Sequence, residues 1–345
     1  MPIMKQVPTV SIIVNNYNYG RFLREAIDSA LSQTYPSTEV IVVDDGSTDN
    51  SREVIASYGS RIVPVLKENG GQASALNAGF AACTGEMAFF LDSDDLLLPT
   101  AAETVVHEWR HGLARVHFPL EVVDANGWPV REVVGGSKLS DPTLGPFVGD
   151  SPTSANVFSR EALDRVMPIP EGDFGRYPDA YVTATTSMLG AVRLVQRPLG
   201  KYRIHGNNKH LSDMGLAQAR RSICATLRLY EALSRLDPDR IGPLGKWLAR
   251  CPQHWVSRIT SLRESPQDHP WPDTLTVLMR RAIGATWCQP YWNFRRKLAY
   301  TVFVIGYSLS PQVIRRALKK AEGNTHAFFP KFLLGSPPAR SGGLN

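Results

Sequence analysis

The chain has 345 residues, and 43% of them are hydrophobic, so it can build one large domain with an appendage and is too apolar to be disordered. Its formal charge of +6 is uneven: residues 1–210 contain 18 Lys/Arg and 24 Asp/Glu, whereas residues 211–345 contain 20 and 8. This split predicts an acidic region that holds a site and a basic region with another role.

The cysteines and the apolar runs indicate where the protein works. The four cysteines are scattered and none lie at metal-ligand spacing, which is typical of reduced thiols. The first residues lack the apolar core of a secretory signal, and no apolar run reaches the roughly 18 residues of a membrane span. We therefore expect a cytoplasmic protein.

Apolar, β-branched runs alternate with helical patterns in the first part of the chain. We predict buried strands over 10–14, 40–43, 62–66 and 87–91. Each is followed by a predicted helix, over about 22–31, 51–58 and 73–83, with the fourth starting at Pro99. Continuously apolar strands that alternate with helices predict an α/β fold, with a mostly parallel sheet flanked by helices.

Polar clusters follow three of these strands, at 15–17, 44–47 and 92–95. Ligands bind at the carboxyl ends of the strands in such sheets, so we expect the clusters to meet at one edge. Asp92, Asp94 and Asp95 are crowded carboxylates, which favour a divalent cation with oxygen ligands. The alternative is an acidic turn that caps the next helix. The glycine patterns of dinucleotide-binding and P-loop proteins are missing.

The later elements are more varied. Strand-like segments over 115–134 contain a turn at Asn126 and Gly127, and the Gly/Pro/Ser-rich stretch 135–155 predicts a mobile loop over the site. Helices over 159–166 and 179–189 and a strand over 191–195 come next. After residue 211 we predict only helices, over 216–236, 244–262, 274–286 and 294–309.

Together these motifs resemble those of the family-2 inverting glycosyltransferases, which use nucleotide sugars and have the GT-A fold. The resemblance rests on residues 8–18, 31–35, 42–49 (VVDDGSTD), 69–72, 77–79, 91–95 (LDSDD) and 202–205 (YRIH), within about the first 60% of the chain. It implies a GT-A nucleotide-sugar-binding catalytic domain over 1–210, with 211–345 as a helical, basic region for acceptor, membrane-surface or oligomer contacts.

The activity implied by the resemblance is metal-dependent, inverting transfer of a sugar from a nucleotide-sugar donor, with UDP favoured, to a hydroxyl acceptor. The acceptor would be a glycan or a lipid-linked sugar in surface or extracellular polysaccharide biosynthesis, and transfer would be non-processive. One alternative is a nucleotidyltransferase on a related fold, which should have a Gly-rich basic loop after the first strand. The other is a non-catalytic nucleotide-binding scaffold, against which the intact Asp45, Asp92, Asp94 and Asp95 argue.

The resemblance also implies roles for donor-binding residues. Asp45 would accept the N3–H of uracil, while Asn15 and Tyr17 would line the base and ribose pocket. Gln72 and Asn77 would lie beside the diphosphate and ribose. Simpler alternatives are a helix cap for Asp45 and ordinary packing for Tyr17.

A D-x-D element is implied at Asp92, Ser93 and Asp94. Mg²⁺ or Mn²⁺ would be bound by Asp94 or Asp95, with a late contact from His205, and the division of labour among the three carboxylates stays open. Arg203 would contact a phosphate. A structural histidine is the alternative for His205.

Inversion by direct displacement requires a general base on the acceptor side. In the family this Asp begins a helix shortly before the 202–205 run, a position that Asp179 fits, with Asp173 as its rival. A helix cap is the alternative role for Asp179.

The basic region has a sequence pattern of its own. Aromatic residues between 287 and 294 precede Arg295, Arg296 and Lys297, and more Lys/Arg follow up to residue 320. Aromatics interleaved with basic residues suit a helix on an anionic membrane surface, at the inner face of the membrane. A solvated basic face and a homo-oligomer contact are the alternatives, and no nucleic-acid-binding module is recognisable.

Overall fold

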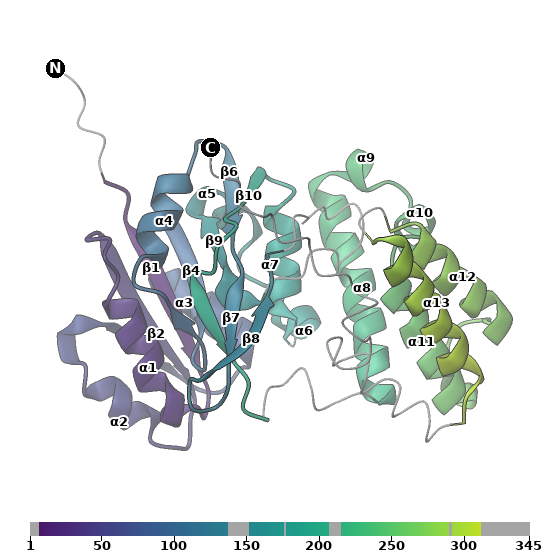
Figure 1. Cartoon of the computed structure of the whole chain (residues 1–345), viewed down its shortest axis with the longest axis horizontal. Coiled ribbons are helices and arrows are strands. Elements are labelled where there is room, and N and C mark those ends of the chain that lie inside the picture. The colour runs from purple at the N-terminus through teal and green to yellow at the C-terminus, as the bar shows by residue number, and fades with distance from the viewer. Residues whose placement is uncertain (1–6, 137–151, 176, 207–214, 290–291, 312–345) are drawn as a thin grey trace, which may run out of the picture. The chain divides into compact units, whose positions relative to one another are not determined.

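The computed structural model describes residues 7–136, 152–175, 177–206, 215–289 and 292–311 (Figure 1). The chain divides into two compact units. The first, which we call the sheet unit, comprises Met1–His205 and Arg228–Ile241. The second, the helical unit, comprises Gly206–Leu227 and Gly242–Asn345.

A seven-stranded sheet forms the centre of the sheet unit, in the order β10-β6-β9-β4-β1-β2-β3. Its strands are β1 (Val10–Asn16), β2 (Thr38–Asp45), β3 (Val63–Lys67), β4 (Met87–Asp92), β6 (Leu113–His117), β9 (Asn156–Ser159) and β10 (Ala191–Leu194). Only β9 runs against its neighbours, β4 and β6. The prediction of a mostly parallel sheet is therefore confirmed.

Successive residues of a strand face opposite sides of the sheet. Both faces of this sheet are apolar, so helices cover both. Ile12 and Val14 of β1 belong to the core formed with α1 (Gly20–Leu31), α2 (Ser51–Ala56) and α4 (Ala101–Glu108). Ile13 faces α3 (Gln72–Ala82), where Gly79 comes so close that an added Cβ would lie 2.3 Å from the Ile13 side chain. A glycine is therefore required at that point of α3.

The Met1–His205 segment of the sheet unit also contains three shorter helices: α5 (Arg160–Val166), α6 (Glu171–Phe174) and α7 (Pro178–Thr186). Helix α7 packs on α5 and β6, and α6 contacts α3. The predicted helix at Pro99 begins later, at Ala101 with Thr100 as its N-cap residue. The turn 92–95 is followed by β5 (Leu96–Leu97), so it does not cap a helix.

A second sheet has the order β5-β11-β7-β8, with β7 (Leu120–Val123), β8 (Pro129–Val134) and β11 (Gly200–Arg203). Strands β7 and β8 form the hairpin predicted from Asn126-Gly127. Gly127 has a φ of +85°, and the Asp124 carboxylate accepts the N–H groups of Asn126 and Trp128, each at 2.9 Å. Most of the loop predicted over 135–155 lies outside the described residues.

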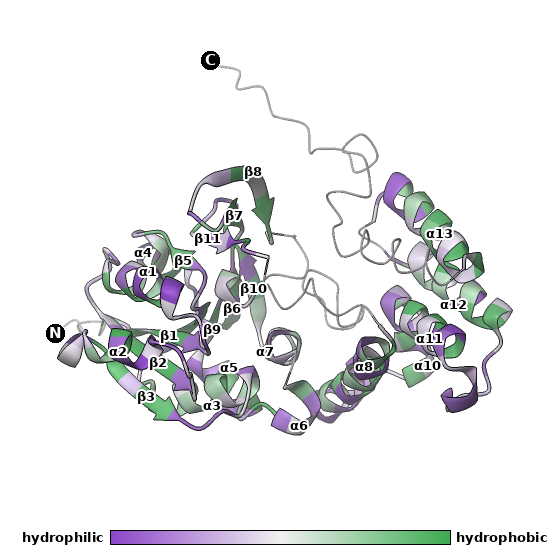
Figure 2. Cartoon of the chain, turned by 90° about the horizontal axis from the view of Figure 1, so that it is seen from below, coloured by the Kyte–Doolittle hydropathy of each residue, from purple (hydrophilic) through white to green (hydrophobic). Residues whose placement is uncertain are grey.

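The C-terminal helices are α8 (Leu216–Leu236), α9 (Pro238–Ile241), α10 (Leu244–Leu248), α11 (Pro252–Glu264), α12 (Leu275–Trp287) and α13 (Phe294–Leu309). Figure 2 shows the mixed hydropathy of their faces. The single helix predicted over 244–262 is wrong, because α10 ends before Pro252, whose ring suits the first turn of a new helix. All four cysteines are free. No helix within the described ranges is long and apolar enough to cross a bilayer.

Candidate active site

Three polar strand ends meet at the carboxyl edge of the main sheet, as the sequence predicts. Asn15 of β1 is paired in register with Asp92 of β4, and Asn16 with Asp44 of β2. The Asn15 amide donates to Asp92 Oδ1 at 2.9 Å, and the Asn16 amide donates to Asp44 Oδ1 at 3.1 Å. Strand β1 thus joins the two acidic ends on either side of it.

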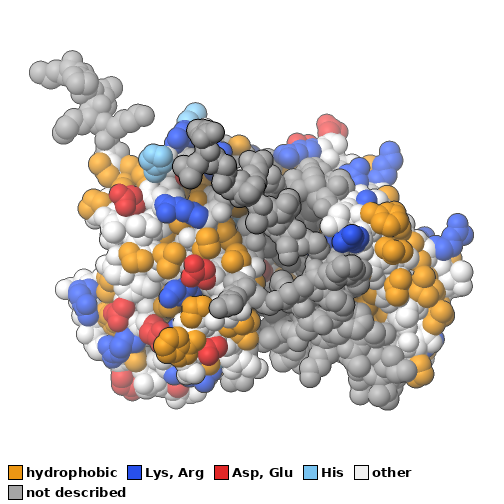
Figure 3. Space-filling model, viewed as in Figure 1, with side chains coloured by type: hydrophobic (Ala, Val, Ile, Leu, Met, Phe, Trp, Pro, Cys, Tyr) orange, Lys and Arg blue, Asp and Glu red, His pale blue; other side chains and the backbone are white. Residues whose placement is uncertain are grey.

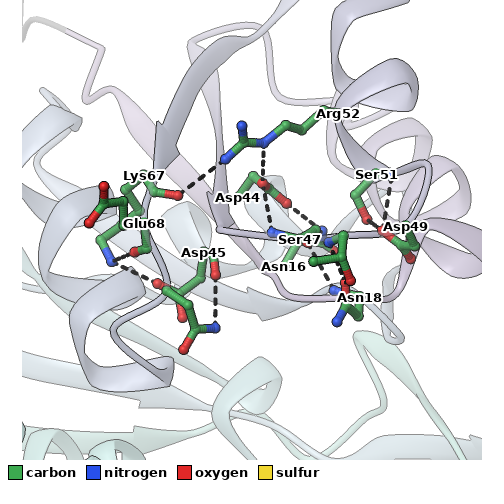
Figure 4. Close-up of polar contacts among 12 residues, drawn as sticks. Asn16, Asn18, Asp44, Asp45, Ser47, Asp49, Ser51, Arg52, Lys67 and Glu68 are labelled. Carbon is green, nitrogen blue, oxygen red and sulfur yellow. Dashed lines mark hydrogen bonds and ion pairs between the residues drawn. The ribbon is translucent and has the colours of Figure 1, made fainter.

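Asp44 organises the loop after β2 (Figure 4). Its fully buried carboxylate accepts the N–H of Ser47 at 3.1 Å and the Nε–H of Arg52 at 3.0 Å through Oδ2, besides the Asn16 amide. Asn18, with a φ of +58°, accepts the N–H of Thr48 at 2.7 Å across the same loop. All of these contacts are internal, so Asp44 holds the loop in shape.

Asp45 points to a different set of donors. Its Oδ1 accepts Lys67 Nζ at 2.7 Å and the N–H of Gly70 at 2.9 Å, and its Oδ2 accepts the N–H of Gly71 at 2.7 Å. Gly71, the N-cap residue of α3, has a φ of +88°, which glycine adopts without strain. The Asn69 amide also donates to the Asp45 carbonyl at 2.9 Å. Asp45 therefore fixes the start of α3 beside the site.

The end of β4 is a tight turn that holds three carboxylates. The N–H of Asp95 donates to the Asp92 carbonyl at 3.0 Å, with Ser93 buried inside the turn. Asp92 Oδ1 accepts the Gln72 amide at 3.0 Å as well as Asn15, and the Asp92 N–H donates to Ser154 Oγ at 3.0 Å. Arg203, which comes from β11, hydrogen-bonds directly to this turn.

Asp95 is buried and accepts the Arg203 N–H at 3.0 Å through Oδ1. Burial raises its pKa well above the usual value, and the charges of Asp94 and Asp92 raise it further, although the Ser154 hydroxyl and the Arg203 N–H oppose this. The same charges add to the burial that raises the pKa of Tyr202. Negative charge is thus in excess at this end of the sheet.

The Arg203 guanidinium is buried beneath the turn. Its Nε–H donates to the Asp94 carbonyl at 3.0 Å, Nη1 to the Ala125 carbonyl at 3.1 Å, and Nη2 to Glu25 Oε2 at 2.7 Å. The guanidinium also lies 4.8 Å from the ring centroid of Phe22. In this structure Arg203 ties the acidic turn to the β7–β8 hairpin and to α1.

His205 lies directly beside Asp94. Its Nε2 is 2.9 Å from Asp94 Oδ2, and its Nδ1 is 3.3 Å from Arg21 Nη2. The ring packs against Tyr19 and Phe22, with centroids 5.3 and 5.0 Å away. Burial and the charge of Asp94 raise the pKa of Tyr19 to about 12, so the phenol stays protonated at neutral pH.

The donor atoms at this point suit a hard or borderline divalent cation. A carboxylate and an imidazole side by side are ligands that Mn²⁺ accepts, and Mg²⁺ commonly takes few protein ligands beside substrate phosphates and water. Within the described ranges, no group of three or more His, Cys, Asp or Glu residues is arranged to hold a metal ion. Asp94 and His205 could supply two of the ligands of such a cation.

Four other residues named from the sequence have surroundings of their own. Asn77 holds the loop before α6, since its amide donates to the Ile169 carbonyl at 3.0 Å and its oxygen accepts the Ile169 N–H at 2.7 Å. Tyr17 is 38% exposed in the loop after β1. Asp179 is half-buried in the first turn of α7. Asp173 in α6 is paired with Arg228 at 3.3 Å.

Sequence reasoning missed several residues that build the site: Lys67, Glu25, Ser154, Arg21 and Tyr19. Lys67 ends β3, so the strand-end argument applied to the other three strands would have found it. Ser154 precedes β9, a four-residue strand whose pairing carried no sequence signal. Its place beside Asp92 depends on contacts between residues 62 positions apart.

Comparisons with known proteins identify the family of the chain. Residues 11–167 match the family described as Glycosyl transferase family 2. An uncharacterized glycosyltransferase of Nostoc sp. is 38% identical over 215 residues, which are 59% of this chain and 67% of that protein. One from Rickettsia typhi is 50% identical over 96 residues, 28% of this chain, and the match spans 30% of its length.

A solved structure, S. aureus TarS 1-349, covers 93% of this chain and 89% of its own, with a TM-score of 0.53 and 15% identity, so the likeness is one of fold. The Nostoc protein carries the relationship further, because it is 38% identical to this chain and the match covers 67% of its length. The chain therefore belongs to glycosyltransferase family 2 and is a glycosyltransferase.

Proposed function

We propose that the chain transfers a sugar from a nucleotide sugar, with UDP favoured, to a hydroxyl group, inverting the anomeric centre. The observation that carries the proposal is the meeting of the Asp45 loop, Asn15 and the Asp92–Asp94–His205 group at one sheet edge. S. aureus TarS 1-349, which has the same fold, has been solved with UDP and with UDP-GlcNAc, and this supports the choice of donor.

The donor would lie across the carboxyl ends of β2, β1 and β4. Asp45 would accept the N3–H of uracil through a free lone pair of its carboxylate, which Lys67 and two backbone N–H groups already orient. Asp92, held by Asn15 and Gln72, would accept ribose hydroxyls. Tyr17 would cover the base from the loop, whereas we assign Asn77 to positioning the loop at Ile169.

Asp94 and His205 would hold Mg²⁺ or Mn²⁺, with Asp95 as the further carboxylate behind them. When bound, such an ion neutralises charge on the leaving nucleoside diphosphate. Arg203 would act as a positioning residue rather than a phosphate ligand, because its guanidinium donates to Asp94, Ala125 and Glu25.

Asp179 is our choice for the general base that takes the proton of the acceptor hydroxyl. It lies in the first turn of α7 on the sheet unit, whereas its rival Asp173 is 43% exposed and paired with Arg228. An ion pair with arginine favours the charged carboxylate and lowers its basicity. The acceptor would be a glycan or a lipid-linked sugar in surface polysaccharide synthesis, at the cytoplasmic side.

A donor screen tests the proposal. The full chain is incubated with UDP-, GDP- and dTDP-sugars, and release of the nucleoside diphosphate is measured with Mn²⁺, with Mg²⁺ and with EDTA. We expect slow, metal-dependent hydrolysis of at least one UDP-sugar, even without acceptor, since water can replace the hydroxyl. Turnover with EDTA, or release from no donor while the protein is folded, would reject the proposal.

A further inference from the structure

Helix α13 of the helical unit exposes a continuous apolar face. The residues of this face, which we call the α13 stripe, recur every three or four positions: Phe294, Leu298, Val302, Ile305 and Leu309. Their exposed fractions run from 40% for Ile305 to 66% for Phe294. In Figure 3, hydrophobic side chains gather with basic ones on the part of the surface that belongs to the C-terminal helices.

The opposite face of α13 is also apolar. Tyr300, Phe303, Val304 and Tyr307 are buried, and α13 packs on α12. No charged residue occurs on α13 after Lys297. A helix that is apolar all round is normally covered on all sides, so the α13 stripe requires a partner surface of its own.

Charge disfavours two of the surfaces that could cover it. Helix α13 begins with Arg295, Arg296 and Lys297, and residues 211–345 carry 20 Lys/Arg against 8 Asp/Glu. A second copy of the helical unit, or the chain's own residues 312–345 with six Lys/Arg and one acidic residue, would place positive charge against positive charge. An anionic lipid surface suits both the apolar stripe and the basic helix start.

We propose that α13 lies along the surface of an anionic bilayer, with the α13 stripe among the acyl chains and Arg295 at the headgroups. Its 16 residues are too few to span the bilayer, so the helix lies in the interface. This inference does not depend on the transfer reaction.

The structure changes which residues make this contact. The sequence pattern pointed to the aromatics before α13, but Trp292 packs on Tyr300 at 5.1 Å and under Arg296 at 4.5 Å. Trp287 donates its indole N–H to Thr301 at 3.1 Å. Trp287 and Trp292 thus hold α13 within its unit, and the α13 stripe is the surface left for lipid.

Vesicle co-sedimentation of the full chain tests the inference. The vesicles are phosphatidylcholine alone or phosphatidylcholine mixed with phosphatidylglycerol. The test variant is Val302→Gln/Ile305→Gln, and the matched control is Val277→Gln, an equally apolar exposed residue on α12 outside the stripe. All three side chains are at the surface, so circular dichroism and melting temperature should match the wild type.

We expect the wild type to pellet with anionic vesicles and less with neutral ones, and added salt to weaken its binding. The double variant should lose about tenfold in partitioning, and Val277→Gln should behave as the wild type. Absence of pelleting by the folded wild type would overturn the inference. So would a dimer in analytical ultracentrifugation that the double variant abolishes while vesicle binding is unchanged.

Discussion

Two strand ends of the same sheet carry neighbouring carboxylates, and the two sets differ in the groups that bind them. At the end of β2, Asp44 is paired with Arg52 and Asp45 with Lys67, and backbone N–H groups complete both sets of contacts. At the end of β4, Asp92 is held by neutral amides, Asp94 by His205, and Asp95 by a backbone N–H. Strand β1 lies between the two ends and pairs directly with both β2 and β4.

The difference teaches where a counter-charge is needed. At the β2 end, the chain's own Arg52 and Lys67 balance the charges of Asp44 and Asp45. This end can therefore present a fixed carboxylate edge to a nucleobase. At the β4 end, burial raises the pKa values of Asp95, Tyr19 and Tyr202, and the neighbouring carboxylates raise them further. A divalent cation would offset the repulsion among these carboxylates, which is the role that the proposed function gives to Mg²⁺ or Mn²⁺.

The largest expected effect concerns a residue at neither end. Asp179→Asn should lower sugar transfer about 10³-fold, because the variant lacks the carboxylate proposed to take the acceptor proton, while UDP affinity stays unchanged. Asp173→Asn is the matched control and should retain transfer. Steady-state kinetics with the donor found by the screen provide the measurement. Full turnover by the Asp179 variant would move the base elsewhere.

The β4 end is tested by Asp94→Asn. Removing this charge should lower metal-dependent donor hydrolysis about 10²-fold and raise the Mn²⁺ concentration needed for half-maximal rate. Hydrolysis measured across a Mn²⁺ series checks both effects. An unchanged Mn²⁺ dependence would mean that the β4 end does not need the cation, and the contrast with β2 would fail.

The β2 end is tested by comparing Asp44→Asn with Asp45→Asn. Each loses charge-assisted hydrogen bonds of a buried carboxylate, so each should reduce the free energy of unfolding by about 2 kcal/mol in urea denaturation. Only Asp45→Asn should also weaken UDP binding, by about tenfold or more. Equal loss of UDP affinity in both variants would contradict the separate roles given to these neighbours.

A smaller effect is expected at a buried histidine, His254 of α11. Burial lowers its pKa to about 3, and neither ring nitrogen has a hydrogen-bond partner within the described residues. Its unfolded pKa is about 6.5, so between these values the unfolded chain binds a proton that the folded one does not. The free energy of unfolding should therefore decrease as the pH is lowered through this window, by up to about 1.4 kcal/mol per pH unit from this residue.

His254→Phe should remove that part of the pH dependence. The ring can occupy the same apolar site against Trp255, 5.0 Å from His254, without an unsatisfied nitrogen. Urea unfolding at pH 7 and pH 5, followed by tryptophan fluorescence, measures the slope. His107→Gln, at an exposed site, is the control, and a slope that His254→Phe leaves unchanged would contradict the account.

Local patterns in the sequence predicted the parts of the fold that depend on local physics. The buried runs of β1, β2 and β4 and the polar residues after them follow from side-chain alternation and strand ends. Strands β5, β9 and β11 have two to four residues and exist because distant segments pair with them. The missing N–H of Pro252 predicts a break between two helices, but the periodicity of the apolar residues continues through this position and hides the break.

The same limit applies to the candidate site. Asp45, Asp92 and Asp94 follow strands that the sequence predicted, so their meeting could be foreseen. The contacts of Arg203 with Glu25, 178 positions away, and of Asn77 with Ile169, 92 positions away, could not. They depend on where the second sheet and the loop before α6 are placed, which no local pattern encodes.

Calorimetric titration of UDP tests the contrast between the two strand ends most directly. The wild type, Asp94→Asn and Asp44→Asn are each titrated with UDP in Mn²⁺ and in EDTA. The account predicts that the wild type and Asp44→Asn bind UDP far more tightly with Mn²⁺ than with EDTA, and that Asp94→Asn loses most of this gain. Equal UDP affinity in Mn²⁺ and EDTA for the wild type would contradict it.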